Sequence, residues 1–123
     1  TKLTVLGMEG RLGQVLRNLL SNAVSFSPPG GMITLAARRQ GRNIVIYVDD
    51  QGPGIPPDKL TAIFERFYSE RPKGEKFGTH SGLGLSISKQ IVEAHGGILT
   101  AENLRDEDGH ILGARFTLQL TAV

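Results

Sequence analysis

Apolar residues recur at helical spacing in two stretches of the chain. The first begins at Arg11 and ends at the breaker run 27–31, which reads Ser-Pro-Pro-Gly-Gly. Its stripe follows the i, i+3, i+4, i+7 spacing of an amphipathic helix. The residues of that stripe are Leu12, Val15, Leu16, Leu19, Leu20 and Ala23. The second stretch runs from Leu83 to His95 and ends at a pair of glycines, which predicts another helix.

Alternation of apolar and polar residues predicts strands elsewhere. Residues 32–37 and 43–48 are separated by a short polar run and are typical of a hairpin. Residues 98–102 and 114–120 predict a second hairpin around an Asp-Gly turn. Residues 1–6 alternate weakly and are interpreted as one more strand.

A third, shorter helix is predicted over 58–67, and residues 68–81 show no period and predict a long loop. This order of elements favours an α+β fold. We expect a two-layer α/β sandwich, with a mixed sheet of about five strands and three helices on one face. Residues 1–123 are expected to form one domain, a fragment of a longer protein.

Composition narrows the possible functions. The chain has 14 basic and 12 acidic residues, a balance that argues against nucleic-acid binding. It has no cysteine, and no apolar run or N-terminal stretch typical of a membrane span or a signal peptide. Its 16 glycines exceed the roughly 9 expected from average usage, and many gather in two places, 52–54 and 78–84.

Two asparagines, Asn18 and Asn22, lie one turn apart on the first predicted helix. Amide oxygens beside phosphates suit Mg²⁺, which prefers a few protein oxygens together with substrate oxygens and water. The alternative is that both side chains simply face solvent. Asparagine forms helices poorly, so two of them inside a helix hint at another purpose.

The predicted strand over 43–48 runs directly into a loop, so that Asp50 lies at the mouth of a Gly-Pro-Gly turn. A carboxylate there can accept a hydrogen bond from an exocyclic amine such as that of adenine. Gly52 and Gly54 let the backbone approach a flat ligand, and Ile55 offers an apolar wall. The competing interpretation is an Asp-Gly turn closed by its own side chain.

Gly82, Leu83 and Gly84 open the second helix. Glycines at a helix start expose backbone N–H groups at the positive end of the dipole, which suits phosphate binding. The string is neither a P-loop nor a dinucleotide-binding fingerprint. A hinge for the preceding loop is the alternative, and it is compatible with a phosphate cradle.

Taken together, these strings resemble the four boxes of histidine-kinase ATP-binding domains of the Bergerat superfamily. Residues 17–23 resemble the N box, 50–55 the G1 box, 63–68 the F box and 81–87 the G2 box. All four occur in family order and cover nearly the whole chain. The F box separates the chain from the gyrase, mismatch-repair and heat-shock chaperone members of the superfamily.

The resemblance implies a role for each matching residue. Asn22 would hold Mg²⁺ and, with Arg66, would serve in catalysis, while Asn18 would lie near the phosphates. Asp50 would accept from the adenine amine, and residues 69–81 would form a lid over ATP. The remaining nucleotide contacts would come from Phe26, Gly52, Gly54, Ile55, Tyr68, Gly82, Leu83, Gly84, Leu85 and Phe116.

By the same resemblance, the chain would bind Mg-ATP and donate its γ-phosphoryl group to a histidine on the dimerisation domain of a parent sensor kinase. A response regulator would be reached indirectly. The domain would be cytoplasmic, without membrane contact of its own, and its parent anchored in the inner membrane. None of the three histidines here matches the acceptor pattern, so we expect all to be non-catalytic: His80, His95 and His110.

Two positions depart from the family pattern. Ser25 and Ser69 stand where many members carry cations that face the phosphates, and basic residues at 66, 71, 73 and 76 are candidates to replace them. Two alternative functions therefore remain open. One is a serine kinase of the anti-sigma-factor kind, and the other is a module that senses ATP without transferring phosphate.

Overall fold

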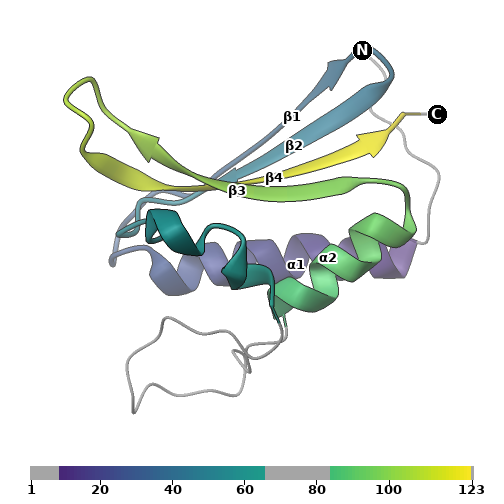
Figure 1. Ribbon diagram of the computed structural model, residues 1–123, viewed down its shortest axis with the longest axis horizontal. Helices are drawn as coiled ribbons and strands as arrows, with labels where there is room; N and C mark the ends of the chain where they lie inside the picture. The colour runs from purple at the N-terminus through teal and green to yellow at the C-terminus, as the bar shows by residue number, and fades with distance from the viewer. Residues whose placement is uncertain (1–8, 66–83, 123) are drawn as a thin grey trace.

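A computed structural model of the chain describes residues 9–65 and 84–122. Within these residues a four-stranded antiparallel sheet lies on two helices, which run side by side under one face (Figure 1). The helices are α1 (Glu9–Phe26) and α2 (Gly84–Ala94). The strands are β1 (Thr34–Gln40), β2 (Asn43–Asp49), β3 (Ile98–Arg105) and β4 (Ile111–Thr121).

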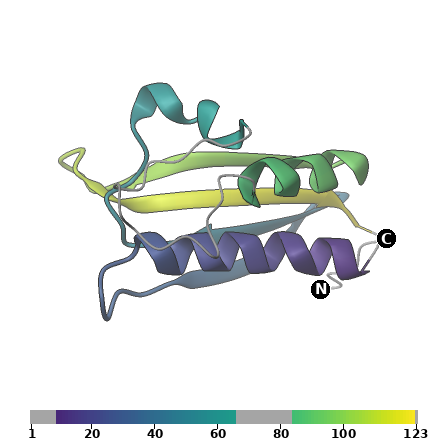
Figure 2. The ribbon, with the colours of Figure 1, turned by 90° about the horizontal axis from the view of Figure 1, so that it is seen from below.

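The strand order is β1-β2-β4-β3, with every neighbouring pair antiparallel. The connection from β2 to β3 therefore passes over β4, and α2 is part of that connection. Viewed from the helix side, α1 and α2 both run roughly along the direction of the strands (Figure 2). The end of α1, in the helix layer, therefore lies against the loop that leaves β2 in the sheet layer.

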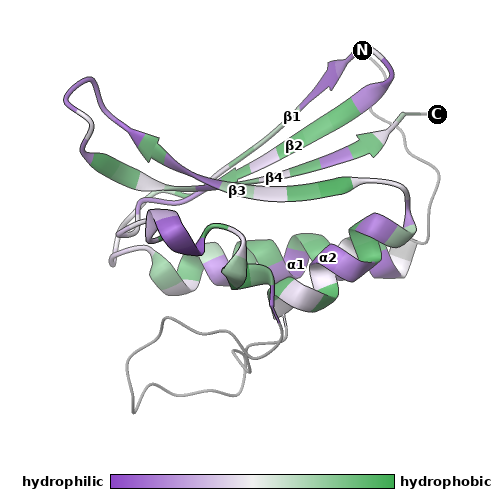
Figure 3. Ribbon diagram, in the orientation of Figure 1, coloured by the Kyte–Doolittle hydropathy of each residue, from purple (hydrophilic) through white to green (hydrophobic). Residues whose placement is uncertain are grey.

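The core lies between the helices and the inner face of the sheet. Alternate residues of β2 and β4 point inward and pair across the strands, for example Val48 with Phe116. Most of β2 is hydrophobic, whereas the turn between β3 and β4 is hydrophilic (Figure 3). The buried cluster is made of Val15, Leu19, Ala23, Val48, Ile63, Ile91, Val92, Leu99, Phe116, Leu118 and Leu120.

The α+β sandwich and the two main helices agree with the sequence prediction, but the mixed sheet of five strands and three helices is not confirmed. All four strands in the described ranges are antiparallel. The strand predicted over 1–6 lies outside these ranges. None of the described helices combines the length and the apolar character that a lipid bilayer crossing requires.

The third helix, predicted over 58–67, is wrong as far as residue 65. Two short 3₁₀ helices take its place, η1 (Pro57–Lys59) and η2 (Ala62–Phe64). The segment begins at Pro56 and Pro57, and the backbone of Glu65 is already extended. It is therefore too short to sustain α-helical turns. Ile63 still reaches the core, which explains why its spacing looked helical.

Gly113 provides a test of how closely β4 approaches the loop after β2. A Cβ at this position would collide with the backbone carbonyl of Asp50, which cannot move without disturbing β2. We expect Gly113→Ala to lower the free energy of unfolding by about 2–3 kcal/mol, measured by urea denaturation. Gly10→Ala is the control, because a Cβ there meets nothing within 4 Å and should raise stability by about 0.5 kcal/mol. Equal stability of the two variants would contradict the close approach.

Candidate functional site

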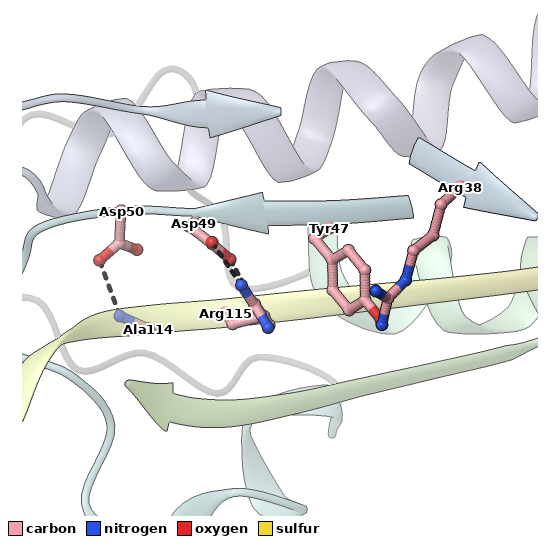
Figure 4. A network of polar contacts seen from close by, with 6 residues as sticks. All are labelled: Arg38, Tyr47, Asp49, Asp50, Ala114 and Arg115. Carbon is pink, nitrogen blue, oxygen red and sulfur yellow. Dashed lines mark hydrogen bonds and ion pairs between the residues drawn. The ribbon is translucent and has the colours of Figure 1, made fainter. Parts of the chain in front are cut away.

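Asp50 is buried at the end of β2, with 5% of its surface exposed. Its Oδ1 accepts hydrogen bonds from the backbone N–H of Gly52 at 2.9 Å and of Ala114 at 3.0 Å. The backbone N–H of Asp50 in turn donates to the carbonyl of Ala114 at 3.0 Å. The carboxylate thus extends the β2–β4 pairing by one residue (Figure 4). The two interpretations of this loop, a ligand acceptor and a turn closed by its own side chain, are therefore compatible, because only one of the two carboxylate oxygens closes the turn.

The second oxygen of this carboxylate has a different environment. Oδ2 of Asp50 accepts no hydrogen bond from the described residues, and no described buried side-chain oxygen lacks a partner. It follows that Oδ2 is open to the surroundings. A carboxylate with one oxygen fixed by backbone and the other open is a rigid acceptor for a ligand N–H group.

Asp49, the preceding residue, points to the opposite face of the sheet. It binds Arg115 with two hydrogen bonds, of 2.7 and 2.9 Å (Figure 4). The guanidinium also lies 4.4 Å from the centre of the Tyr47 ring. The hydrogen bond with Asp49 raises the pKa of Arg115, so the guanidinium stays charged. It holds β2 to β4 directly beside Asp50.

Two glycines shape the loop that follows. A Cβ at Gly52 would lie 2.6 Å from the carbonyl oxygen of Phe26, so the loop passes directly against the end of α1. Gly54 has φ +83°, a conformation that side chains rarely adopt. A Cβ there would also lie 2.5 Å from Cγ2 of Ile111. The loop therefore touches α1 on one side and the β3–β4 hairpin on the other.

Side chains tie the same loop at further points. Gln51 accepts from the backbone N–H of Met32 at 2.8 Å, and its own N–H donates to the Ser27 hydroxyl at 3.2 Å. Asn103 binds both the N–H and the carbonyl of Ile55, each at 2.7 Å. Sequence reasoning missed Asn103. The available signal was a polar residue on the inward row of β3, where a buried amide needs partners.

The two asparagines of α1 differ in their contacts. The amide nitrogen of Asn18 donates to the Gly84 carbonyl at 3.3 Å and to the Ser88 hydroxyl at 3.2 Å, which joins α1 to α2. Asn22, one turn further along, is half-buried, and its side chain makes no hydrogen bond with a described residue. The amide nitrogen of Asn18 is thus used in packing, whereas neither end of the Asn22 amide has a described partner.

The start of α2 lies beside this row of α1, since Asn18 contacts Gly84. The first N–H groups of a helix have no partner within the helix, so this end can receive phosphate oxygens. Leu85 is half-buried against the core, as is Ile55. Gly82 and Leu83, by contrast, lie outside the described residues.

The aromatic residues predicted to line the nucleotide differ in their burial and their contacts. Phe26 is half-buried, with its carbonyl against Gly52. Phe116 is only 3% exposed and belongs to the core, where Phe64 packs edge-on at a centroid distance of 6.1 Å. Phe116 therefore packs in the core against the F-box residue Phe64. The other predicted residues of this region, Arg66, Tyr68 and the lid over 69–81, lie outside the described residues.

Of the histidines, His95 ends α2, and its Nδ1 lies 2.8 Å from the carbonyl of Ile91. His110 lies in the β3–β4 turn with Asp106 and Asp108, a group whose spacing is compatible with a cation. The backbone N–H groups of His110 and Asp108 already donate to Asp106, which accounts for the cluster as a turn. His80 lies outside the described residues.

Comparison with known proteins agrees with this geometry. Residues 7–123 match the profile of the family described as histidine kinase-, DNA gyrase B- and HSP90-like ATPase. Sensor protein ChvG of Rhizobium meliloti (strain 1021) is 54% identical over 119 residues, which cover 96% of this chain and 21% of ChvG. Sensor-like histidine kinase SenX3 of Mycobacterium tuberculosis (strain H37Rv) is 37% identical over 123 residues, covering 100% of this chain and 29% of SenX3.

Solved structures show the same fold. The mycobacterial sensor histidine kinase MprB superposes with a TM-score of 0.82 at 34% identity, covering 95% of this chain and 74% of the other. Full-length ShkA, solved in complex with AMPPNP, superposes with a TM-score of 0.75 at 30% identity, covering 94% of this chain and 22% of ShkA.

The chain spans about a fifth of the length of the first curated relatives, at 21% of each. The resemblance to histidine-kinase ATP-binding domains is confirmed by the profile and by these relatives. The chain belongs to the histidine kinase-, DNA gyrase B- and HSP90-like ATPase family.

Proposed function

We propose that this chain binds Mg-ATP and presents its γ-phosphoryl group to a histidine on the dimerisation domain of a longer sensor kinase, in two-component signalling. The observation that carries the proposal is Asp50. One of its oxygens is held by backbone N–H groups, and the other is open at the mouth of a glycine loop. The names of the relatives, which are sensor kinases, support the same assignment.

The base would lie against the loop after β2. Oδ2 of Asp50 accepts from the exocyclic amine of adenine. Gly54, which has no Cβ to collide with Ile111 or Asn103, lets the loop lie close to the β3–β4 hairpin. Ile55 and Phe26, both half-buried, provide apolar contacts beside it. Because the loop is already tied to its neighbours, little ordering entropy is lost when the base binds.

The phosphates would lie between α1 and the start of α2. Free N–H groups in the first turn of α2 stabilise the phosphate oxygens, and the Asn22 amide oxygen suits Mg²⁺. The ion, when bound, neutralises phosphate charge during transfer. Asn18 would lie near the phosphates, and its bonds to Gly84 and Ser88 also hold α2 in place.

Replacing Asp50 by asparagine tests the base contact without disturbing the turn. An asparagine can keep its oxygen toward Gly52 and Ala114, and it then presents an N–H donor where Oδ2 accepted. We expect Asp50→Asn to weaken Mg-ATP binding by about 10- to 150-fold in calorimetric titration. Asp108→Asn removes the same charge at the exposed β3–β4 turn and should leave the affinity at the wild-type level. Equal affinity of Asp50→Asn and wild type would refute the adenine site.

Asn22→Ala tests the metal assignment. In the wild-type chain Mg²⁺ should tighten ATP binding, and the variant should lose most of that gain because an oxygen ligand is missing. Binding of ATP without Mg²⁺ should not change. Titrations with and without Mg²⁺ measure both quantities, and Ser21→Ala, an exposed neighbour on α1, is the control. A variant that keeps the full Mg²⁺ effect would exclude Asn22 as the ligand.

The chemistry of the product separates transfer to histidine from the alternatives. The dimerisation domain of the longer kinase, mixed with this chain and γ-labelled ATP, should acquire phosphate that is labile in acid and stable in base. Phosphate stable in acid would indicate the serine kinase instead. Binding of ATP with no labelled protein would favour the sensing module, to which the serines at 25 and 69 point.

A further inference from the structure

We infer that Asn103 is a positioning residue for base recognition, an inference that rests on the proposed function. Asn103 belongs to none of the four boxes, and it contacts the loop after β2 from the β3 side. Its Oδ1 accepts from the N–H of Ile55, and its Nδ2 donates to the carbonyl of the same residue, both at 2.7 Å. It thereby holds one end of the loop whose other end is Asp50.

A carboxamide is suited to this contact because it has the donor and the acceptor of a peptide group in one plane. The loop after β2 leaves the sheet, so Ile55 has no strand beside it to supply the usual pair of bonds. Asn103 supplies that pair from its side chain. Without it, a half-buried N–H and carbonyl would need other partners.

The register shows why this contact bears on Asp50. Asn103 pairs with Ala114 in the β3–β4 ladder. Ala114, on its other side, donates its N–H to Oδ1 of Asp50. Asp50, Ala114 and Asn103 therefore form one row across three strands. Both ends of the loop, at Asp50 and at Ile55, are fixed to this row, which sets the separation between the carboxylate and the apolar wall.

The missing side chain of Gly54 allows the loop to lie this close to Asn103. A Cβ on this residue would lie 2.8 Å from Oδ1 of Asn103, so the loop backbone rests directly on the amide. No side chain fits between them. If the amide is lost, Gly54 and Ile55 are free to move relative to Asp50, and a base can no longer meet both at once.

A double titration distinguishes positioning from a general structural role. Mg-ATP is compared with the triphosphate of a purine that lacks the 6-amino group. In the wild-type chain the amine should add affinity through Asp50. In Asn103→Ala and in Asn103→Ser, we expect ATP binding to weaken about tenfold while the analogue is little affected, so that the preference for ATP largely disappears. Asn103→Asp keeps the acceptor alone and should fall between wild type and Asn103→Ala.

Asn43→Ala is the matched control. Asn43 is also a half-buried strand asparagine, but it lies at the far end of β2, so Asn43→Ala should keep the wild-type affinity for both ATP and the analogue.

If the Asn103 variants lose ATP and analogue affinity equally, the residue only supports the fold and the inference is wrong. If they keep the wild-type preference while Asp50→Asn loses it, the inference fails and the base site stands. If Asp50→Asn keeps the preference, the base site itself fails, and the inference with it. Should Asn103→Ala not fold, Asn103→Ser carries the same comparison.

Discussion

The last residue of β2 and the residue that follows it are both aspartates, and their backbone sends the two carboxylates to opposite faces of the sheet. β4 binds both of them, Asp49 through the Arg115 guanidinium and Asp50 through the Ala114 N–H. The pairing of β2 with β4 is thus maintained up to the point where the loop begins. If this end of β2 separated from β4, the inner carboxylate would lose its orientation and the loop would lose its starting point.

Within the described residues the helices cover one face of the sheet, and this arrangement brings α1 to the loop after β2. The carbonyl of Phe26, at the end of α1, approaches Gly52 of that loop. Asn18, two turns earlier on the same helix, bridges to Gly84 at the start of α2. In the proposed function, the base and the phosphates would therefore both contact groups that α1 positions. The outer face is left to polar pairs such as Asp49 with Arg115.

A feature could be predicted from the sequence where the residues that form it are neighbours along the chain. The helical stripe over α1 and the turn at Asp50 depend on neighbouring residues, and both were predicted. Strand ends were placed too early, since β1 continues to Gln40 through a polar stretch that only its pairing with β2 supports. The contact of Asn103 with Ile55 joins positions 48 residues apart, so no local pattern contains it. The helix expected over 58–67 was wrong as far as residue 65, because the spacing of its apolar residues does not show that the backbone is already extended at Glu65.

Asn18 and Asn22 show why a matching string does not by itself define a role. They are identical residues one turn apart on the same helix, and either amide could serve a ligand. Packing separates them, because α2 begins beside Asn18 and takes up its amide nitrogen, while Asn22 is left without a partner among the described residues. Asp50 follows the same logic within one side chain, where one oxygen is used by the fold and the other is open. Groups that the fold leaves unsatisfied, held rigidly by groups that it satisfies, are what give a ligand a specific position.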